Sequence, residues 1–270
     1  MTVTTSLNTH AQRGAPSGRI GRVLGGFGTL LVVPAIILVL WAVVAASLQS
    51  LVFPGPVESA RGLLADLERP EFLAGVGTSV RLLVVAWLGA AVMGGLLGFV
   101  LGQSPFWSQV FQTPLFAFYS IPKVTLYPVF LLLIGLGEPS RIAFAFFHGV
   151  FPMALLVMGA TAGLDRRLVR LADALQLSRT QRVRMVILPA LLPTVLMALR
   201  ISFGLTFLGL VLAEMFSANV GLGRELVNNV AQVRVDRIAG QIVLIALIAL
   251  GPVLTMLAIE RRIRARMGIR

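Results

Sequence analysis

The chain has 270 residues, of which 57% are hydrophobic and only 13% are charged, and its formal net charge is +12. An ordinary soluble domain carries about 25% charged residues, so this composition and a mean hydropathy of +0.91 exclude a soluble protein and indicate membrane spans. The absence of cysteine excludes disulfides, thiolate metal sites and a cysteine nucleophile.

The first 20 residues are polar and rich in Gly, Pro and Ser, which predicts a disordered tail. Beyond them, six stretches approach the roughly 20 apolar residues that a span needs. Five are continuous and lie at about 27–48, 80–101, 142–162, 192–216 and 238–259. The sixth, at about 111–136, is broken by Pro114, Pro122, Lys123 and Pro128. Because a backbone in lipid must satisfy its own hydrogen bonds, we expect an all-α membrane protein with about six transmembrane helices.

Arginine is distributed unevenly between the two sides of these spans. The N-terminal tail, the loop between the fourth and fifth spans and the C-terminal tail hold fourteen arginines, against six in the other loops. The positive-inside rule therefore places both termini in the cytoplasm. We interpret the excess charge as a topology signal and a contact for anionic lipid, and expect no nucleic-acid partner.

The two longest outer loops, 51–77 and 218–237, are too short to form a solute-binding domain. The first contains a short acidic amphipathic piece, SARGLLADLERPEFL. Any capture of solute must therefore be performed by a separate protein.

Gly94, Gly98 and Gly102 recur at four-residue spacing, which lets another helix approach closely. Packing within the chain is favoured over a subunit interface. In the broken span, Pro122 and Pro128 remove backbone donors, and the freed carbonyls line a pathway or merely mark a kink.

Arg200 and Glu214 lie in one span, about 21 Å apart along a helix and about 40° apart around it. Charges at membrane depth face protein or a water-filled cavity. Together with Lys123, these residues either line a pathway or act as buried structural partners. No catalytic or metal-binding motif occurs, and a lone His148 is no ligand set, so we expect no enzyme activity and no metal.

The polar loop at 163–189 predicts two short helices. Asp165 is placed to cap the first, and Leu168, Leu171, Ala172 and Leu175 form one apolar stripe. Ser178 and Gln181 form an S-x-x-Q capping box for the second. Pro189 and Pro193 predict a turn into the next span. Such a loop either lies on anionic lipid or inserts into a groove of a cytoplasmic partner.

The loop resembles the coupling segment of binding-protein-dependent ABC importer permeases, whose pattern is E-A-A, three residues, G, nine residues, I-x-L-P. The spacing is kept here with Arg170, Leu171 and Ala172, then Gln176, and finally Val186, Leu188 and Pro189. Residues 119–142 and 199–223 resemble the branch that serves nitrate, sulfonate, taurine and some vitamin precursors. The departures are Arg170, where the family has an acid, and Gln176, where it has glycine.

The resemblance implies a permease without an ATPase site of its own, with no cofactor on this chain and ATP on partner subunits. It implies a second permease subunit, an ATP-binding cassette dimer and an extracytoplasmic solute-binding protein as partners, in a bacterial inner membrane. The solute would be small and anionic or heterocyclic, like nitrate, a sulfonate, taurine or a pyrimidine. Coupling to the ATPase would use residues of the loop: Asp165, Leu168, Arg170, Leu171, Ala172, Leu175, Gln176, Ser178, Leu188 and Pro189.

We accordingly divide the chain into a cytoplasmic tail (1–20), a first span with an outer loop (21–78), a permease core (79–260) and a basic cytoplasmic tail (261–270). The alternative function is a membrane scaffold or sensor that docks a cytoplasmic partner without transport. An intramembrane enzyme is disfavoured by the missing catalytic residues.

Overall fold

The computed structural model describes residues 19–48 and 53–266, so the predicted disordered tail and the last four residues lie almost wholly outside the described part. The chain divides into two units, up to Pro56 and from Val57 onward. The first unit contains α1 (Arg19–Leu48), which begins inside the predicted tail. Its side chains from Val32 to Leu48 are almost all exposed, and the indole N–H of Trp41 donates to the carbonyl of Pro54 at 3.0 Å.

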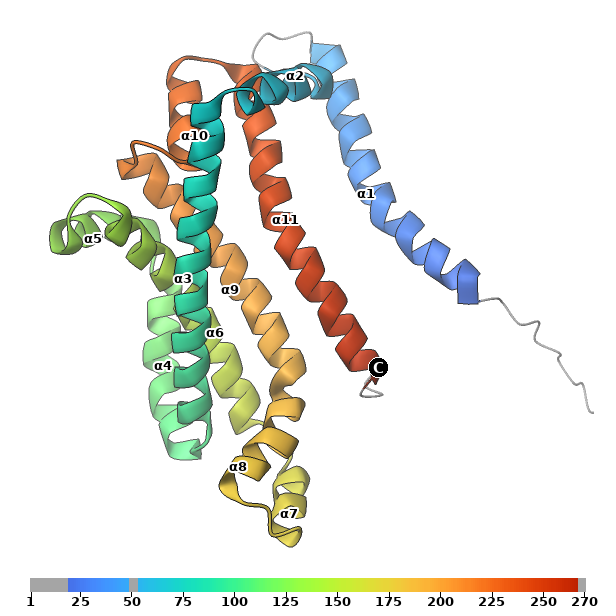
Figure 1. Cartoon of the computed structure of the whole chain (residues 1–270), viewed down its shortest axis with the longest axis vertical. Helices are drawn as coiled ribbons and strands as arrows, with labels where there is room; N and C mark the ends of the chain where they lie inside the picture. The colour runs from blue at the N-terminus through green and yellow to red at the C-terminus, as the bar shows by residue number, and fades with distance from the viewer. Residues whose placement is uncertain (1–18, 49–52, 267–270) are drawn as a thin grey trace, which may run out of the picture. The chain divides into compact units, whose positions relative to one another are not determined.

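The second unit is a bundle of helices, shown in Figure 1. Its helices, in chain order, are α2 (Pro56–Leu67), α3 (Pro70–Gly102), α4 (Pro105–Ser120), the short η1 (Lys123–Leu126), α5 (Tyr127–Ile134), α6 (Glu138–Ala162), α7 (Arg166–Ala174), α8 (Arg179–Arg182), the π-turn η2 (Val183–Ile187), α9 (Leu188–Ser217), α10 (Leu222–Ala231) and α11 (Val235–Arg266). No strand occurs in the described residues. The predicted all-α membrane fold is confirmed.

The helices α3, α6 and α9 form the centre of this unit, with α6 packed against both of the others. The main apolar cluster joins all three and includes Leu82, Ala145 and Phe207. An edge-to-face contact between Trp87 and Phe203, with ring centroids 5.6 Å apart, reinforces it. The core therefore lies along the middle of the bundle, while the outward faces of α3, α4 and α11 stay exposed and apolar.

Four described helices are long and apolar enough to cross a bilayer: 70–102, 138–162, 179–217 and 235–263. The paired segments 105–120 and 123–134 pass the same test together, with a bend of 83° between them. The structure thus accounts for four or five of the six predicted spans. The first predicted span falls on α1, of which the stretch Val32–Leu48 is apolar.

The predicted break in the third span occurs at Pro122. Helix α4 ends at Ser120, and Ile121 is extended, with ψ of 137°, because a residue before proline avoids the helical region. Pro114 stays inside α4. Pro128 lies in the first turn of α5, where a missing N–H has no helical partner to lose.

Two local features differ from what the sequence pattern suggests. Helix α3 contains the predicted span at about 80–101 and extends it back to Pro70, because proline in the first turn and Glu71 behind it favour a helix start. The predicted turn at Pro189 and Pro193 is absent, and the helix continues from α8 through η2 into α9. The π-turn, in which the N–H of Leu188 bonds to Val183, accommodates the proline that follows.

Polar residues fasten the outer helix α2 to the bundle. Asp66 has no exposed surface, and one of its oxygens accepts from Arg69 at 3.0 Å and from Arg237 at 2.8 Å. Arg69 also donates to Glu225 of α10 at 2.8 Å. The hydrogen bonds to Glu225 first, and to Asp66 second, outweigh partial burial and raise the pKa of Arg69 above its ordinary value.

Cysteine labelling tests the orientation of this bundle, because the chain has no cysteine of its own. Gln232, after α10, and Thr180, in α8, are exposed residues at opposite ends of α9 in sequence. In intact cells, an impermeant maleimide is expected to label Gln232→Cys and to leave Thr180→Cys unlabelled until the membrane is opened. Labelling of Thr180→Cys from outside would overturn the cytoplasmic placement of the loop.

Candidate functional site

The two-helix loop between α6 and α9 is the most distinctive polar feature of the bundle, and Figure 1 shows α7 and α8 at one end of the second unit. Both predicted caps are confirmed. The side chain of Asp165 accepts from the N–H of Arg167 at 2.8 Å. Ser178 and Gln181 form the reciprocal capping box, each side chain bonding the backbone N–H of the other. Residues within the loop itself thus cap both of its helices.

One face of this loop is apolar and uncovered. Leu171 is 54% exposed and Leu175 is 62% exposed, and Leu168 and Leu188 are also exposed. Ala172 differs from them, since it is 1% exposed and packs inside the subunit. The stripe is therefore narrower than the sequence predicts, and between about a third and two thirds of each leucine side chain stays exposed in the described part of the second unit.

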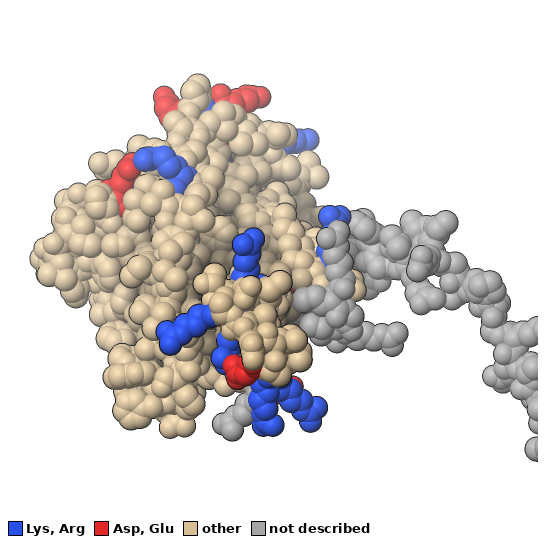
Figure 2. Space-filling view, turned by 60° about the horizontal axis from the view of Figure 1, so that its bottom comes forward, with Lys and Arg blue, Asp and Glu red and all other residues tan. Residues whose placement is uncertain are grey.

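The flank of the stripe is basic. Arg167, Arg170 and Arg179 are exposed, and Figure 2, which brings this end of the molecule forward, shows several Lys and Arg side chains gathered there. Arg182 of α8 pairs with Asp173 of α7 at 2.8 Å, which ties the two short helices together. The loop therefore presents leucines beside a positive surface.

Gln176 lies in the turn between α7 and α8, at the position where the family pattern has glycine. Its φ is +51°, in the left-handed region where glycine is favoured. The N–H of Leu177 bonds to Ala172 and that of Gln176 bonds to Asp173, which is the Schellman pattern. The backbone keeps the turn that the family builds with glycine, at a cost of roughly 1–2 kcal/mol.

The three spaced glycines lie against α6. A Cβ added to Gly94 would come within 2.6 Å of the carbonyl oxygen of Val150, and one on Gly98 within 2.4 Å of that of Ala154. At Gly102 the obstacle is Thr161, at 2.6 Å. The small side of α3 is thus filled by a helix of the same subunit.

Three of the candidate pathway residues gather at the break in the third span. Lys123 follows Pro122 and donates from its amine to the carbonyl oxygen of Tyr119 at 2.7 Å. The same amine lies 4.9 Å from the centre of the Tyr119 ring. Pro128 begins the next helix after one short turn. The break therefore combines a cation, a freed carbonyl and an aromatic face.

Arg200 and Glu214 have separate partners within the subunit. Arg200 pairs with Glu260 of α11 at 3.3 Å. Glu214 has no exposed surface, and its oxygens accept from the Ser79 hydroxyl at 2.6 Å and the Gly223 N–H at 2.9 Å. Ser79 in turn accepts from the N–H of Leu222 at 2.9 Å. These contacts match the structural-partner alternative for both residues.

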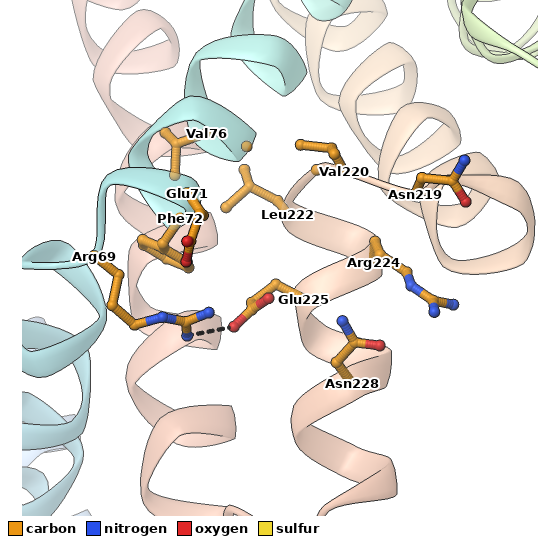
Figure 3. A pocket seen from close by; sticks show the side chains of 12 residues that line it. Arg69, Glu71, Phe72, Val76, Asn219, Val220, Leu222, Arg224, Glu225 and Asn228 are labelled. Carbon is orange, nitrogen blue, oxygen red and sulfur yellow. Dashed lines mark hydrogen bonds and ion pairs between the residues drawn. The ribbon is translucent and has the colours of Figure 1, made fainter.

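A small pocket at the end of the bundle opposite the two-helix loop was not anticipated from the sequence. It is lined by residues of α3, the connection after α9, and α10, and it includes Arg69, Glu71, Arg224 and Glu225. Figure 3 shows Arg69 reaching across to Glu225 of α10. Charges of both signs line it, and Arg69 and Glu225 pair with each other. The buried Asp66 that supports Arg69 carries no motif by which sequence could have found it.

Comparison with known proteins places this geometry in a family. Residues 90–269 match the family described as the binding-protein-dependent transport system inner membrane component. The chain belongs to this family and is a multi-pass membrane permease component of a binding-protein-dependent ABC importer.

Three curated relatives belong to the branch that the sequence resembles. An aliphatic sulfonates transport permease protein of Bacillus subtilis, SsuC, is 28% identical over 80% of this chain and 78% of its own length. The taurine transport system permease protein TauC of Escherichia coli is 27% identical over 87% of both chains. The nitrate import permease protein NrtB of Synechocystis is 26% identical over 70% of this chain and 72% of its own.

Two solved structures share the fold. The MetNI methionine ABC transporter, in an inward-facing conformation, gives a TM-score of 0.59 at 20% identity and covers 72% of this chain and 95% of that chain. A bacterial alginate ABC transporter, in complex with a pentasaccharide-bound periplasmic protein, gives 0.60 at 18% identity and covers 90% and 96%.

The turn at Gln176 yields a prediction about the stability of the loop. Gln176→Gly is expected to stabilise α7 by about 1 kcal/mol, because glycine has no Cβ to strain the left-handed turn. Hydrogen exchange of the Leu177 amide should slow. Thr180→Gly is the control, because Thr180 lies in the ordinary helical turn of α8. Glycine should weaken that turn, so the amides of α8 should exchange faster. Faster exchange in Gln176→Gly would mean that the glutamine side chain itself holds the turn.

The contacts of Glu214 yield a second prediction. Glu214→Ala leaves the Ser79 hydroxyl and the Gly223 N–H without their acceptor, at about 1–3 kcal/mol for each buried donor. The melting temperature in detergent should fall, and fall less in Glu214→Gln. Leu208→Ala, exposed on the same helix, is the control. Lost uptake with unchanged melting in Glu214→Ala would instead assign Glu214 to the pathway.

Proposed function

We propose that this chain is the permease subunit of an ATP-driven importer and moves a small oxyanion across the bacterial inner membrane. In this proposal it pairs with a second permease subunit, two ATP-binding cassette subunits and an extracytoplasmic solute-binding protein. ATP binds to the cassette subunits, and this chain contributes no ATPase site. Both termini and the α7–α8 loop lie in the cytoplasm.

One observation carries the proposal: a self-capped pair of short helices between two spans, with leucines left uncovered on its surface. A loop that exists only to connect α6 to α9 has no need of exposed leucines at 171 and 175. An apolar stripe of this kind gains free energy when a partner covers it. The proposed partner is the cassette ATPase, whose closing would move the loop and switch the direction in which the pathway opens.

The basic flank of the loop indicates the charge of the partner groove in which the loop would fit. Arg170 occupies the place where the family pattern has an acid, so the partner surface opposite it should be neutral or acidic. Either this subunit has an ATPase adapted to that charge, or it works beside a second permease chain that keeps the acidic pattern. Both arrangements agree with an intact turn at Gln176.

The solute class rests on the relatives, whose names refer to aliphatic sulfonates, taurine and nitrate. All of these carry oxyanion groups. Among the described residues, the connections from α2 to α3 and from α9 to α11 are too short to form a solute-binding domain, which fits the dependence of the family on a binding protein. Within the subunit we place the pathway at Pro122, Lys123 and Pro128, because Arg200 and Glu214 are occupied by partners of their own.

A charge placed in the leucine stripe tests the docking proposal. Leu171→Asp would bury an unpaired carboxylate against an apolar groove, and removing an ion from water costs on the order of several kcal/mol in a protein. The cassette ATPase should no longer co-purify, and ATP-dependent uptake of taurine, ethanesulfonate and nitrate into proteoliposomes should be lost. Membrane abundance should be unchanged.

Thr180→Asp is the matched control, because Thr180 is exposed on α8 outside the stripe. It should keep both co-purification and uptake. If Leu171→Asp also keeps both, the loop lies on lipid and the docking proposal fails. A third outcome would favour a scaffold or sensor. In that case Leu171→Asp abolishes co-purification, but the complex with the unaltered chain imports none of the three probes.

A further inference from the structure

The helix α4 carries its polar residues on one side only. Seen along the axis at about 100° per residue, they fall within an arc of about 140°, and the rest of the circumference is apolar. The polar set is Ser108, Gln109, Gln112, Thr113, Tyr119 and Ser120. We call this set the α4 stripe. Lys123 follows it directly, beyond the break at Pro122.

The α4 stripe is not covered within the subunit. None of the residues of α4 is buried, and its contact with α6 uses Phe118, whose ring lies 5.4 Å from Phe151 and 6.5 Å from Phe147. Phe118 lies outside the polar arc. The stripe therefore remains free while the helix is fixed by its aromatic side.

Two cavities follow the stripe. One of about 610 Å³ is lined by Gln112, Thr113 and Tyr119 together with residues of α6 and α9. The other, of about 730 Å³, lies toward the two-helix loop and is lined by Ser108 and Gln109. The stripe thus forms the wall of open space along much of α4.

The charges beside these cavities are positive. Arg179 and Arg182 line the cavity near the loop, and the Asp173 partner of Arg182 is not among its lining residues. At the other end, the amine of Lys123 is held over Tyr119, which lines the first cavity. No acid lines either cavity among the described residues, and none forms an ion pair with Lys123.

Amides, hydroxyls and an ammonium group at membrane depth are costly against lipid, so such groups face protein or water. Amide N–H groups, hydroxyls and cations are also the donors that an oxyanion accepts from. We propose that the α4 stripe is the solute-contact wall of the pathway, and that Lys123 is the cation that attracts a small oxyanion to it. This inference rests on the proposed function and specifies its solute site.

Charged thiol reagents test the inference without knowledge of the solute. Gln112→Cys is placed on the stripe, and Val110→Cys, exposed on the apolar side of the same helix, is the matched control. The whole complex in opened membranes is treated with a methanethiosulfonate that carries a sulfonate and with one that carries a quaternary ammonium. Gln112→Cys should react and Val110→Cys should not, because the thiol must ionise in water to react.

The second arm concerns the charge of Lys123. Adding Lys123→Gln to Gln112→Cys should lower the ratio of the anionic to the cationic rate by roughly tenfold, the lower end of the effect that charged clefts exert on ion encounter. Lys123→Arg should keep the ratio. Membrane abundance of each variant shows whether it folds, and Lys123→Met, which also removes the charge, replaces Lys123→Gln if the glutamine variant does not accumulate.

Several outcomes would overturn the inference. An unreactive Gln112→Cys in the complex would mean that a second copy or lipid covers the stripe. If the ratio of anionic to cationic rates is the same with and without the charge at Lys123, Lys123 is not the anion site. The claim that the α4 stripe faces the pathway would then stand alone. These results are independent of uptake, since a complex that imports the three probes can still show an unreactive stripe, and the importer proposal would then stand without this inference.

Discussion

The close approach of α6 to its two neighbours is the constraint on which the rest of the bundle depends. On one side, Gly94 and Gly98 bring α3 so near that any Cβ would meet backbone atoms of α6 at 2.4–2.6 Å. On the other side, Gly149 of α6 lies against Ser202 and Thr206 of α9. Without a hydrophobic driving force between helices in lipid, such backbone proximity and the dispersion contacts that it allows are what hold spans together. Larger side chains at these glycines would separate the helices that carry every other feature.

Buried polar contacts then fix how the outer end closes over this core. Glu214 at the end of α9 joins Ser79 of α3 to the start of α10, through residues far apart in the chain. Asp66 and Arg69 do the same for α2, α10 and α11. An unsatisfied buried group costs more than a made hydrogen bond contributes, so these contacts specify one arrangement of the outer helices. The loop at the opposite end is specified locally instead, by its caps and its turn.

Much of the fold could be predicted from local pattern. Apolar length located the four continuous helices that are long enough to cross a bilayer, and the S-x-x-Q spacing at Ser178 located the second loop helix with its cap. Proline was harder to interpret, because its effect depends on its place in a helix. Pro122 breaks a span, whereas Pro193 lies inside the continuous α9. The start of α3 at Pro70 was missed for the same reason.

The candidate site was predictable where it is local and not where it depends on distant residues. The caps of the loop follow from residues within one turn of each other, whereas Ala172 of the predicted stripe is buried by contacts that the pattern did not show. The partners of Glu214 and Arg200 could not be found from spacing, because Ser79 and Glu260 lie on other helices. Unusual backbone conformations could not be predicted from residue spacing either. Val233, after α10, is a β-branched residue with a φ of +55°. The left-handed conformation of Gln176 is likewise seen only in the structure.

The most direct test of the account is photo-crosslinking from the exposed face of the loop. A photoreactive side chain at Leu171, in the full chain in its native membrane, would join covalently to whatever lies on the leucine stripe. The account predicts that the main adduct is an ATP-binding cassette protein and that the same probe at Thr180 gives much less of it. Adducts with lipid alone at both positions would contradict the claim that this loop couples the permease to its motor.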